Sequence, residues 1–389
     1  MFSEAETEER YSRQIRFAPI GPRGQRRLGE ASVLVVGAGA LGASLAQHMV
    51  RAGVGRMRLV DRDFVELSNL HRQTLFDEED AEAALPKAVA AAAKLRRANG
   101  RARIEAFVAD VDKHNVEALV ADTDLVLDGT DNAATRLLLS DACFSRGIPL
   151  VYGGVAGSAG MSALLVPGDH CCLRCLLGTE DASDVDETAQ TCDTLGVISP
   201  AVEWVAALQA SEALKLLTDN RAALRGTWVM LDVWNFAIKE WKLPPAVDSC
   251  PYCGWGERET AVMDRYSAAG VGGAALYRDG ERDGRQTDDD PEAGAPVLLC
   301  GRDTFQLKLD PSVSLEEWKR LLLAAGCTIT ADNRYLVRAL TVEGERIVVF
   351  AEGRSLIQGA GEADRVMTIY RHYLRGENRR DTVEKSDRV

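Results

Sequence analysis

Four cysteines form two pairs whose spacing is typical of metal ligands. Cys172 and Cys175 lie in "HCCLRC", and Cys250 and Cys253 lie in "SCPYCG". Each pair presents two thiolates from one tight turn, and two pairs complete the tetrahedral site that Zn²⁺ prefers. The chain has nine cysteines and an acidic, polar start unlike a secretory signal. We therefore predict a structural zinc that staples two segments of a larger fold, rather than a redox pair or disulfides.

A glycine pattern indicates a nucleotide site. The motif "GAGALG" supplies Gly37, Gly39 and Gly42 directly after an apolar strand and at the head of a helix. Glycine lets the backbone approach a phosphate closely, and a helix N-terminus offers free N–H groups and a partial positive charge. Asp61 ends the next strand, where a carboxylate can accept hydrogen bonds from ribose. Alone, these residues favour an NAD-dependent dehydrogenase.

The polar residues that follow favour a nucleoside triphosphate instead. The loop "DRDFVELSNLHRQTLF" holds the candidate ligands Asp63, Asn69, Arg72 and Gln73. An arginine and an asparagine beside a nucleotide pocket can hold the outer oxygens of a triphosphate, which a dinucleotide does not need.

Lys87 and Asp131 complete this candidate set. Lys87 lies in "LPKAV", and Asp131 lies in "GTDN" at the carboxyl end of a strand, where open α/β sheets bind ligands. The pair would suit a nucleoside triphosphate and its Mg²⁺. The competing interpretation is that Lys87 is a solvated helix residue and that Asp131 caps a helix.

Cys192, in "ETAQTCDTLG", lies in an acidic segment without metal-ligand spacing. Its acidic neighbours disfavour a permanent thiolate, so it is either a stray loop thiol or a nucleophile.

Alternating strands and helices must position these residues. Strands at 33–36 and 57–60 with a helix at about 41–52 form a βαβ unit, and the alternation continues along the chain. We predict a doubly wound, Rossmann-like, mostly parallel α/β sheet with a zinc-stapled segment. Residues 200–218 have apolar positions at helical spacing and predict a long helix. The Arg-rich segment 10–30 is expected to be a lead-in rather than a core element.

Composition divides the 389 residues into three parts. Residues 1–260 hold all the motifs, residues 261–294 contain a charged, Gly-rich linker, and residues 295–380 predict a small β/α domain. The net charge of −13 argues against a nucleic-acid partner, and no apolar run reaches membrane-spanning length. We expect a cytoplasmic protein.

The motifs occur in the order found in the ThiF/MoeB/HesA family, the prokaryotic relatives of ubiquitin-activating enzymes. "RYSRQI", "VLVVGAGALG", "VDRDFVELSNLHRQTLF", "PKA", "GTDN", "TCDTLGVISP" and the two cysteine pairs fall within residues 10–255. The chain resembles this family over that range, and its C-terminal part resembles the extension of some ThiF-type proteins. Glu203 and Trp204 are bulkier than the residues usual at this helix start in the family.

The resemblance implies ATP-dependent adenylation of a small ubiquitin-like sulfur carrier protein that ends in Gly-Gly. The carrier's carboxylate would attack the α-phosphate, giving an acyl-adenylate and pyrophosphate. A cysteine desulfurase or other sulfur donor would then form a thiocarboxylate for thiamin thiazole, molybdopterin or related sulfur transfer. Two alternatives stay open: a related activating enzyme that forms an amide or isopeptide-type bond or modifies tRNA, and an NAD-dependent oxidoreductase.

The resemblance also implies roles for individual residues. The nucleotide would be bound by Gly37, Gly39, Gly42 and Asp61, and its ribose and phosphates would be held by Asp63, Asn69, Arg72 and Lys87. Asp131 would coordinate Mg²⁺, and Arg13 would reach the phosphates from the partner subunit of a homodimer. Cys192 would become linked to the activated carrier.

Overall fold

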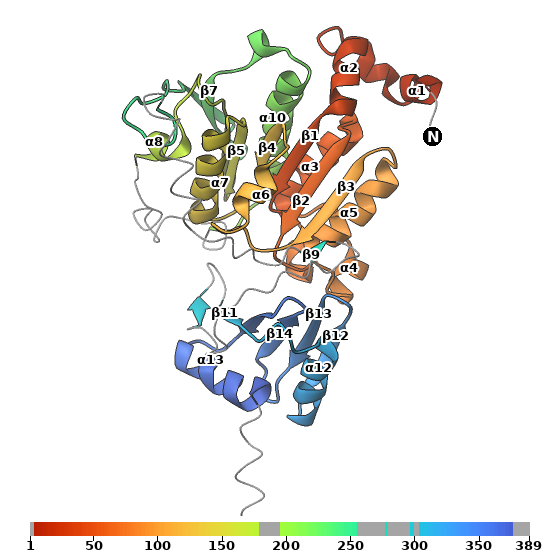
Figure 1. Ribbon diagram of the computed structural model, residues 1–389, viewed down its shortest axis with the longest axis vertical. Helices are drawn as coiled ribbons and strands as arrows, with labels where there is room; N and C mark the ends of the chain where they lie inside the picture. Colours follow the sequence, from red (N-terminus) through yellow and green to blue (C-terminus); the bar gives the residue numbers. More distant parts are fainter. Residues whose placement is uncertain (1–3, 179–194, 255–276, 279–295, 299–302, 376–389) are drawn as a thin grey trace, which may run out of the picture. The chain divides into compact units, whose positions relative to one another are not determined.

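The computed structural model describes residues 4–178, 195–254, 277–278, 296–298 and 303–375. The chain divides into two compact units (Figure 1). Unit 1 comprises Met1–Glu78 and Pro86–Thr287, and unit 2 comprises Glu79–Leu85 and Asp288–Val389. Most of the predicted linker at 261–294 lies outside the described residues, so its extent stays a prediction.

Unit 1 is built on a sheet whose described strands follow the order β8-β7-β6-β5-β4-β1-β2-β3-β9. Their bounds are β1 (Ser32–Val36), β2 (Arg56–Asp61), β3 (Arg103–Val108), β4 (Leu125–Asp128), β5 (Leu150–Ala156), β6 (Ala159–Leu165), β7 (Thr227–Asp232), β8 (Ala237–Lys242) and β9 (Tyr277–Arg278). Strands β1 to β5 are parallel to one another, and β6 to β9 pair antiparallel. The predicted mostly parallel, doubly wound fold is confirmed, and β6–β8 extend it on one edge.

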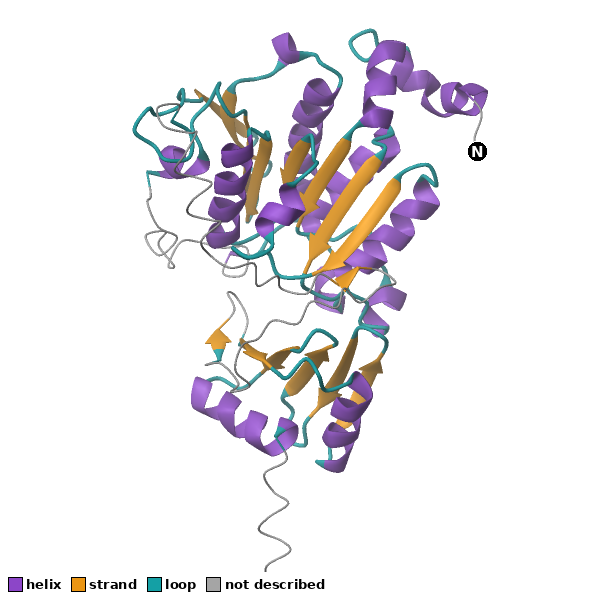
Figure 2. Cartoon of the chain, in the orientation of Figure 1, coloured by secondary structure: helices purple, strands orange, loops and turns teal. Residues whose placement is uncertain are grey.

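Helices cover both faces of this sheet (Figure 2). They include α3 (Ala40–Ala52), α5 (Lys87–Ala98), α6 (Val116–Val120), α7 (Ala133–Arg146) and α10 (Ser199–Leu217). Leu34 and Val36 of β1 pack with Val116 and Leu139 of α6 and α7, whereas Val35 faces α3. Since successive strand residues point to opposite faces, a strand covered on both faces is apolar throughout, as β1 is. The helix predicted at 200–218 is confirmed as α10.

The lead-in at 10–30 folds as two helices, α1 (Glu4–Ile15) and α2 (Gly21–Glu30). Leu28 of α2 is fully buried. Gln14 and Gln25 both donate to the carbonyl oxygen of Ala52 at the end of α3, at 2.8 and 3.0 Å. The prediction that this segment lies outside the core was therefore wrong, because its many arginines occupy the exposed sides of helices that bury their apolar positions.

Short elements complete unit 1. They are η1 (Leu67–Asn69), α8 (Leu173–Leu177) and η3 (Arg221–Ala223), while α4 (Glu78–Glu82) leads into the segment that packs with unit 2. Within the described ranges, every helix is too short or too polar to span a bilayer.

Unit 2 contains an antiparallel sheet of order β10-β11-β15-β14-β13-β12. Its elements are β10 (Val297–Leu298), β11 (Thr304–Lys308), α12 (Leu315–Ala324), β12 (Thr328–Asp332), β13 (Leu336–Leu340), β14 (Arg346–Phe350), β15 (Arg354–Gln358), α13 (Ala363–Ile369) and a π-helical turn, η4 (Tyr370–Leu374). Trp318 of α12 and Val366 of α13 pack on one face of the sheet with Val337, Ile347 and Ile357. The separate C-terminal β/α fold is confirmed.

Candidate nucleotide and metal sites

The glycine turn after β1 closes on the end of β4 with almost no space between the backbones. Gly37 has a φ of +85°, and a Cβ there would lie 2.6 Å from the carbonyl oxygen of Gly129. A Cβ on Gly42 would lie 1.7 Å from the carbonyl oxygen of Gly37. At Gly39, the nearest atom to an added Cβ is Nε2 of Gln73 at 3.8 Å. Gly37 and Gly42 thus permit the turn, and Gly39 leaves room at the N-terminus of α3 for an anion.

This turn lies where the strand order of the sheet reverses. β1 pairs with β2 on one side and with β4 on the other, although the chain passes from β1 to β2 and reaches β4 only after β3. Open α/β sheets bind ligands in the crevice at such a point, beyond the carboxyl ends of the strands.

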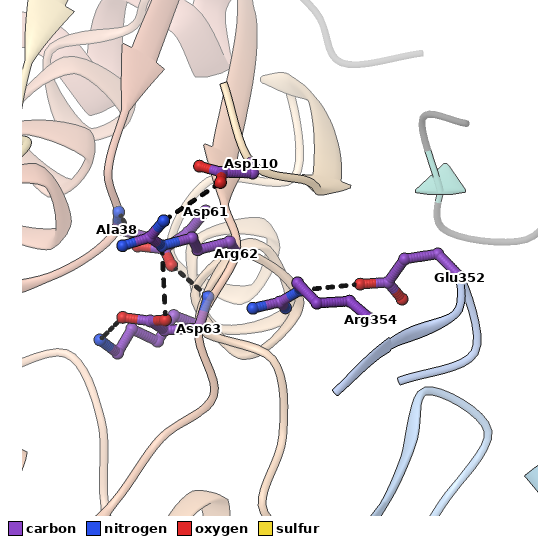
Figure 3. A network of polar contacts seen from close by, with 8 residues as sticks. Ala38, Asp61, Arg62, Asp63, Asp110, Glu352 and Arg354 are labelled. Carbon is purple, nitrogen blue, oxygen red and sulfur yellow. Dashed lines mark hydrogen bonds and ion pairs between the residues drawn. The ribbon is translucent and has the colours of Figure 1, made fainter. Parts of the chain in front are cut away.

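Asp61 holds the two loops that flank this crevice. Its Oδ2 accepts from the N–H of Ala38 and its Oδ1 accepts from the N–H of Asp63, both at 2.6 Å (Figure 3). Burial raises the pKa of Asp61, and the nearby ammonium of Lys87 opposes that rise. Asp61 is thus at the end of β2 as predicted, and it also fixes the backbone of the glycine turn.

Lys87 is buried, with 7% of its surface exposed. Its Nζ lies 3.1 Å from Oδ2 of Asp63, and its backbone N–H donates to the carbonyl oxygen of Asp63 at 2.8 Å. Burial alone would lower the pKa of Lys87, but the carboxylates of Asp63 and Asp61 raise it above its ordinary value. The interpretation of Lys87 as a solvated helix residue is therefore excluded, and the site contains a fixed cation.

The polar loop after β2 contributes three further side chains. Asn69 is fully buried in η1 and its Oδ1 accepts from the N–H of Glu66 at 3.3 Å. Nη1 of Arg72 donates to the carbonyl oxygen of Ser68 at 3.0 Å. Gln73 is buried beside Gly39, and its Oε1 has no hydrogen-bond partner among the described residues. An orphaned polar atom next to the glycine turn fits a site that a polar ligand completes.

Asp131 is exposed just beyond β4. The N-cap of α7 is Asn132, whose Oδ1 accepts from the N–H of Thr135 at 2.8 Å. The interpretation of Asp131 as the helix cap is therefore wrong. Burial would lower the pKa of Arg62, but the carboxylates of Asp110, Asp63 and, more weakly, Asp131 raise it. Asp131 thus adds to the negative charge around Arg62, on the loop after β2.

Sequence reasoning missed the pair that shapes the turn carrying Asp131. Asp128, buried at the end of β4, accepts from the N–H and the hydroxyl of Thr130, at 2.9 and 2.7 Å. Nε of Arg136 lies 3.4 Å from Oδ2 of Asp128, and its Nη2 donates to the carbonyl oxygen of Thr130 at 2.6 Å. The arginine in "ATR" was the available signal.

Glu203 of α10 connects two parts of the site. Its Oε2 accepts from the hydroxyl of Ser44 in α3 at 2.8 Å, and its Oε1 accepts from Thr74, two residues after Arg72, at 3.3 Å. The bulky residue at this helix start thus braces the glycine-turn helix against the polar loop.

Two predicted residues are not brought into this group. Arg13 is exposed in the last turn of α1, so its role across a subunit interface stays a prediction. Cys192 lies outside the described residues.

The four predicted metal ligands converge. The Sγ atoms of Cys172, Cys175, Cys250 and Cys253 all lie within 4.8 Å of one another. The Cys172–Cys250 and Cys175–Cys253 sulfur pairs are both 3.7 Å apart. A disulfide needs about 2.05 Å, whereas four sulfurs at 2.3 Å around a tetrahedral Zn²⁺ are about 3.8 Å apart. The cluster therefore fits a metal ion.

Charge chemistry favours the same occupant. Burial raises the pKa of Cys172, and it is the main cause that raises the pKa of Cys175 to about 12. For Cys250, burial is outweighed by hydrogen bonds, foremost from the N–H groups of Cys253 and Tyr252, which lower its pKa to about 7. A divalent cation would stabilise all four thiolates.

The cluster joins segments that are far apart in sequence. Arg174, between the first two cysteines, makes ion-paired hydrogen bonds of 2.8 to 3.0 Å with Asp141 of α7. The same guanidinium lies 5.3 Å from the ring centre of Tyr252, between the last two cysteines. A metal here would hold the segments after β6 and β8 against α7.

Comparison with known proteins gives one consistent result. Residues 11–252 match the ThiF family. The sulfur carrier protein ThiS adenylyltransferase of Bacillus subtilis (strain 168) is 37% identical over 370 residues, which cover 94% of this chain and 99% of that protein. The molybdopterin-synthase adenylyltransferase of Escherichia coli (strain K12) is 38% identical over 246 residues, covering 63% of this chain and 96% of that protein.

The solved structures agree on the fold. E. coli MccB, in a crystal structure with MccA-N7isoASN, aligns with a TM-score of 0.54 at 20% identity, covering 64% of this chain and 74% of that one. At this identity the likeness shows a shared fold alone.

The glycine turn generates a test by substitution. Gly42→Ala should lower the free energy of unfolding by about 1–3 kcal/mol, because its methyl group collides with the backbone of Gly37. Gly39→Ala is the matched control and should cost less than about 1 kcal/mol, because its methyl group makes only an ordinary van der Waals contact, 3.8 Å from Nε2 of Gln73. Urea unfolding followed by circular dichroism measures both values. Equal losses in the two variants would contradict the described turn.

Proposed function

Because this chain belongs to the ThiF family, we propose that it uses ATP to adenylate the C-terminal carboxylate of a ubiquitin-like sulfur carrier protein. The relative from B. subtilis, named as a ThiS adenylyltransferase, aligns along nearly its whole length. A SAMP-activating enzyme E1 of Haloferax volcanii is 41% identical over 248 residues, covering 64% of this chain and 89% of that protein. These names favour a sulfur carrier over both alternatives, an amide-forming or tRNA-modifying enzyme and an oxidoreductase.

The observation that carries the proposal is the buried Lys87, fixed by Asp63 beside the glycine turn. The attacking carboxylate and the triphosphate are both anionic, so the reaction needs charge neutralisation and alignment more than a protein nucleophile. Lys87 is held in place before ATP arrives, and the guanidinium of Arg72 is held on the loop after β2 by the carbonyl oxygen of Ser68. Fixed cations of this kind stabilise the charge that develops on phosphate oxygens without reorganising during the reaction.

We assign the other residues within this scheme. The N-terminus of α3 and Gly39 would receive the phosphates, Asn69 and Gln73 would contact the nucleotide, and Asp131 would hold Mg²⁺. The Mg²⁺ would neutralise the pyrophosphate leaving group. Asp131 is suited to this role because Asn132 caps α7 and leaves the carboxylate of Asp131 exposed.

This chain offers the carrier an apolar surface at the edge of the sheet where the parallel strands end. β7 runs antiparallel to β6, which runs antiparallel to β5, so β7 ends at the edge where the parallel strands end. Its hairpin exposes Trp234 and Phe236 by 78% and 80%. The ring centres of Phe236 and Trp204, the neighbour of Glu203, lie 6.3 Å apart. Exposed aromatic clusters mark protein-binding surfaces. Through Trp204 this cluster adjoins Glu203, which contacts both α3 and the polar loop of the proposed nucleotide site.

We further propose that the four-cysteine cluster holds one structural Zn²⁺. Its four thiolates fill the tetrahedral shell and leave no open position for catalysis. Free thiolates persist in a reducing compartment, which fits a cytoplasmic protein. A cysteine desulfurase or other protein would supply sulfur after adenylation, and Cys192 is our candidate for linkage to the carrier at that later step.

Removing the charged side chain of Asp131 or Arg72 should stop formation of the acyl-adenylate. Asp131→Ala and Arg72→Ala should each abolish carrier-dependent exchange of labelled pyrophosphate into ATP while the circular dichroism spectrum stays unchanged. Arg51→Ala and Asp364→Ala, which remove exposed charges elsewhere, are the controls and should exchange normally. Normal exchange by either site variant would remove these residues from the mechanism.

A substitution in the hairpin after β7 should weaken binding of the carrier and leave binding of ATP unchanged. Phe236→Ala should raise the KM for the carrier about 5- to 30-fold, as loss of an aromatic anchor does at protein interfaces, with the KM for ATP unchanged. Leu323→Ala in α12 also removes an exposed apolar side chain and serves as the control. A carrier KM equal to that of the parent protein would rule out the hairpin as the docking surface.

Whether Arg13 acts in the partner subunit's site of a homodimer can be tested by combining two inactive variants. Arg13→Ala and Asp131→Ala proteins should each be inactive, and unfolding and refolding them together at equal amounts should restore about one quarter of parental exchange. Half of the random dimers are then mixed, and each mixed dimer has one intact site. No recovery, with mixed dimers demonstrated by mass, would place Arg13 in its own subunit's site or outside any site.

A further inference from the structure

The segment Glu79–Leu85 packs with unit 2, although unit 1 surrounds it in sequence. On its N-terminal side the chain comes from the loop that carries Arg72 and Gln73. On its C-terminal side only Pro86 separates it from Lys87, the first residue of α5. The segment therefore joins two groups of site residues while its packing partners belong to the C-terminal part of the chain.

One side chain of unit 2 holds this segment directly. Asn333, in the turn between β12 and β13, donates from Nδ2 to the carbonyl oxygen of Ala83 at 2.8 Å. Its Oδ1 accepts from the N–H groups of Tyr335 and Leu336, at 2.9 and 3.1 Å. Because the turn fixes the acceptor end of the amide, the donor end is aimed at Ala83.

The held segment is a compact turn in an unfavourable backbone conformation. Ala84 has a φ of +48° and is fully buried. The N–H of Ala84 donates to the backbone carbonyl oxygen of Ala81 at 3.2 Å, and the N–H of Leu85 donates to the backbone carbonyl oxygen of Asp80 at 3.0 Å. A non-glycine residue keeps left-handed backbone only where its surroundings hold it.

The far end of the segment is tied to the site. Phe64 and Pro86 form an isolated antiparallel bridge, and the N–H of Lys87 donates to the carbonyl oxygen of Asp63. The helix that carries Lys87 therefore has its start tied to the loop after β2, and in sequence only Pro86 separates it from the segment that Asn333 holds.

We propose that Asn333 is a positioning residue for the nucleotide site: by holding Ala83, it fixes residues 79–85 and thereby the start of the helix that carries Lys87. The consequence for activity rests on the function proposed above. The C-terminal part of the chain then contributes to adenylation without contributing a group to the reaction.

The test uses the full-length protein with Asn333→Asp. The aspartate keeps an acceptor for the turn amides but replaces the donor with an oxygen that cannot bond to the carbonyl of Ala83. Gln358→Glu is the matched control, because Oε1 of Gln358 accepts from Arg346 at 3.1 Å and the glutamate retains that acceptor. Hydrogen exchange at the amides of Ala83, Ala84, Leu85 and Lys87, without nucleotide, is the first readout.

In Asn333→Asp these amides should exchange about fivefold faster or more, as expected for one lost hydrogen bond, while amides of β13 and β14 stay protected. The KM for ATP in pyrophosphate exchange should rise by a similar factor with a smaller change in kcat. Gln358→Glu should change neither. Should the aspartate unfold unit 2, Asn333→Ser, which retains an acceptor for the turn but is too short to reach Ala83, replaces it.

Unchanged exchange at the four amides in a folded variant would overturn the proposal, as would faster exchange with an unchanged KM. The hydrogen-exchange readout does not depend on catalysis. If the parent protein failed to exchange pyrophosphate, the proposed function would fall, and the hold of Asn333 on the segment would still be measured.

Discussion

The whole nucleotide site depends on one close approach of backbone to backbone, between the turn after β1 and the turn after β4. Carbonyl oxygens and α-carbons of Gly37, Gly42 and Gly129 meet where a Cβ on any of them would collide at 3.0 Å or less. This contact brings the start of α3, the proposed anion-binding helix terminus, to the end of β4, which Asp131 follows. The proposed contacts of the α3 terminus with phosphate and of Asp131 with Mg²⁺ follow from that placement.

Charge is arranged around this turn before any ligand binds. Asp61 is committed to two backbone amides and Asp63 to Lys87, so these carboxylates position other groups. Buried charges keep such an arrangement only when they are paired and hydrogen-bonded. The result is a buried lysine cation held by Asp63 and Asp61, while Arg72 lies on the same loop as Asp63. Such a preorganised arrangement of charge fits the proposed reaction between two anions.

Local pattern was sufficient to predict the parallel half of unit 1 and where most of the candidate site residues lie along its strands. The glycine motif, the apolar β1 and the position of Asp131 after β4 are all encoded within short stretches. Pairings across long distances in sequence were not accessible in the same way. The antiparallel β6 to β8, the buried side of α2 under its arginines, and the tie of Asn333 to Ala83 depend on tertiary contacts that no local pattern records. Lys87 and Asn132 show the same limit, because only the fold reveals that the lysine is buried and that the neighbouring asparagine, not Asp131, is the cap.

The central claim is that the carrier's carboxylate attacks the α-phosphate of ATP in this site. It can be tested with a carrier whose C-terminal carboxylate is labelled with ¹⁸O, incubated with the protein, ATP and hydroxylamine, followed by mass spectrometry of the AMP. Attack forms a bond from a labelled oxygen to the α-phosphorus, and hydroxylamine then takes the acyl group and releases AMP. We predict AMP that carries one ¹⁸O atom, together with a carrier hydroxamate. Unlabelled AMP, or formation of ADP and phosphate in its place, would contradict the account.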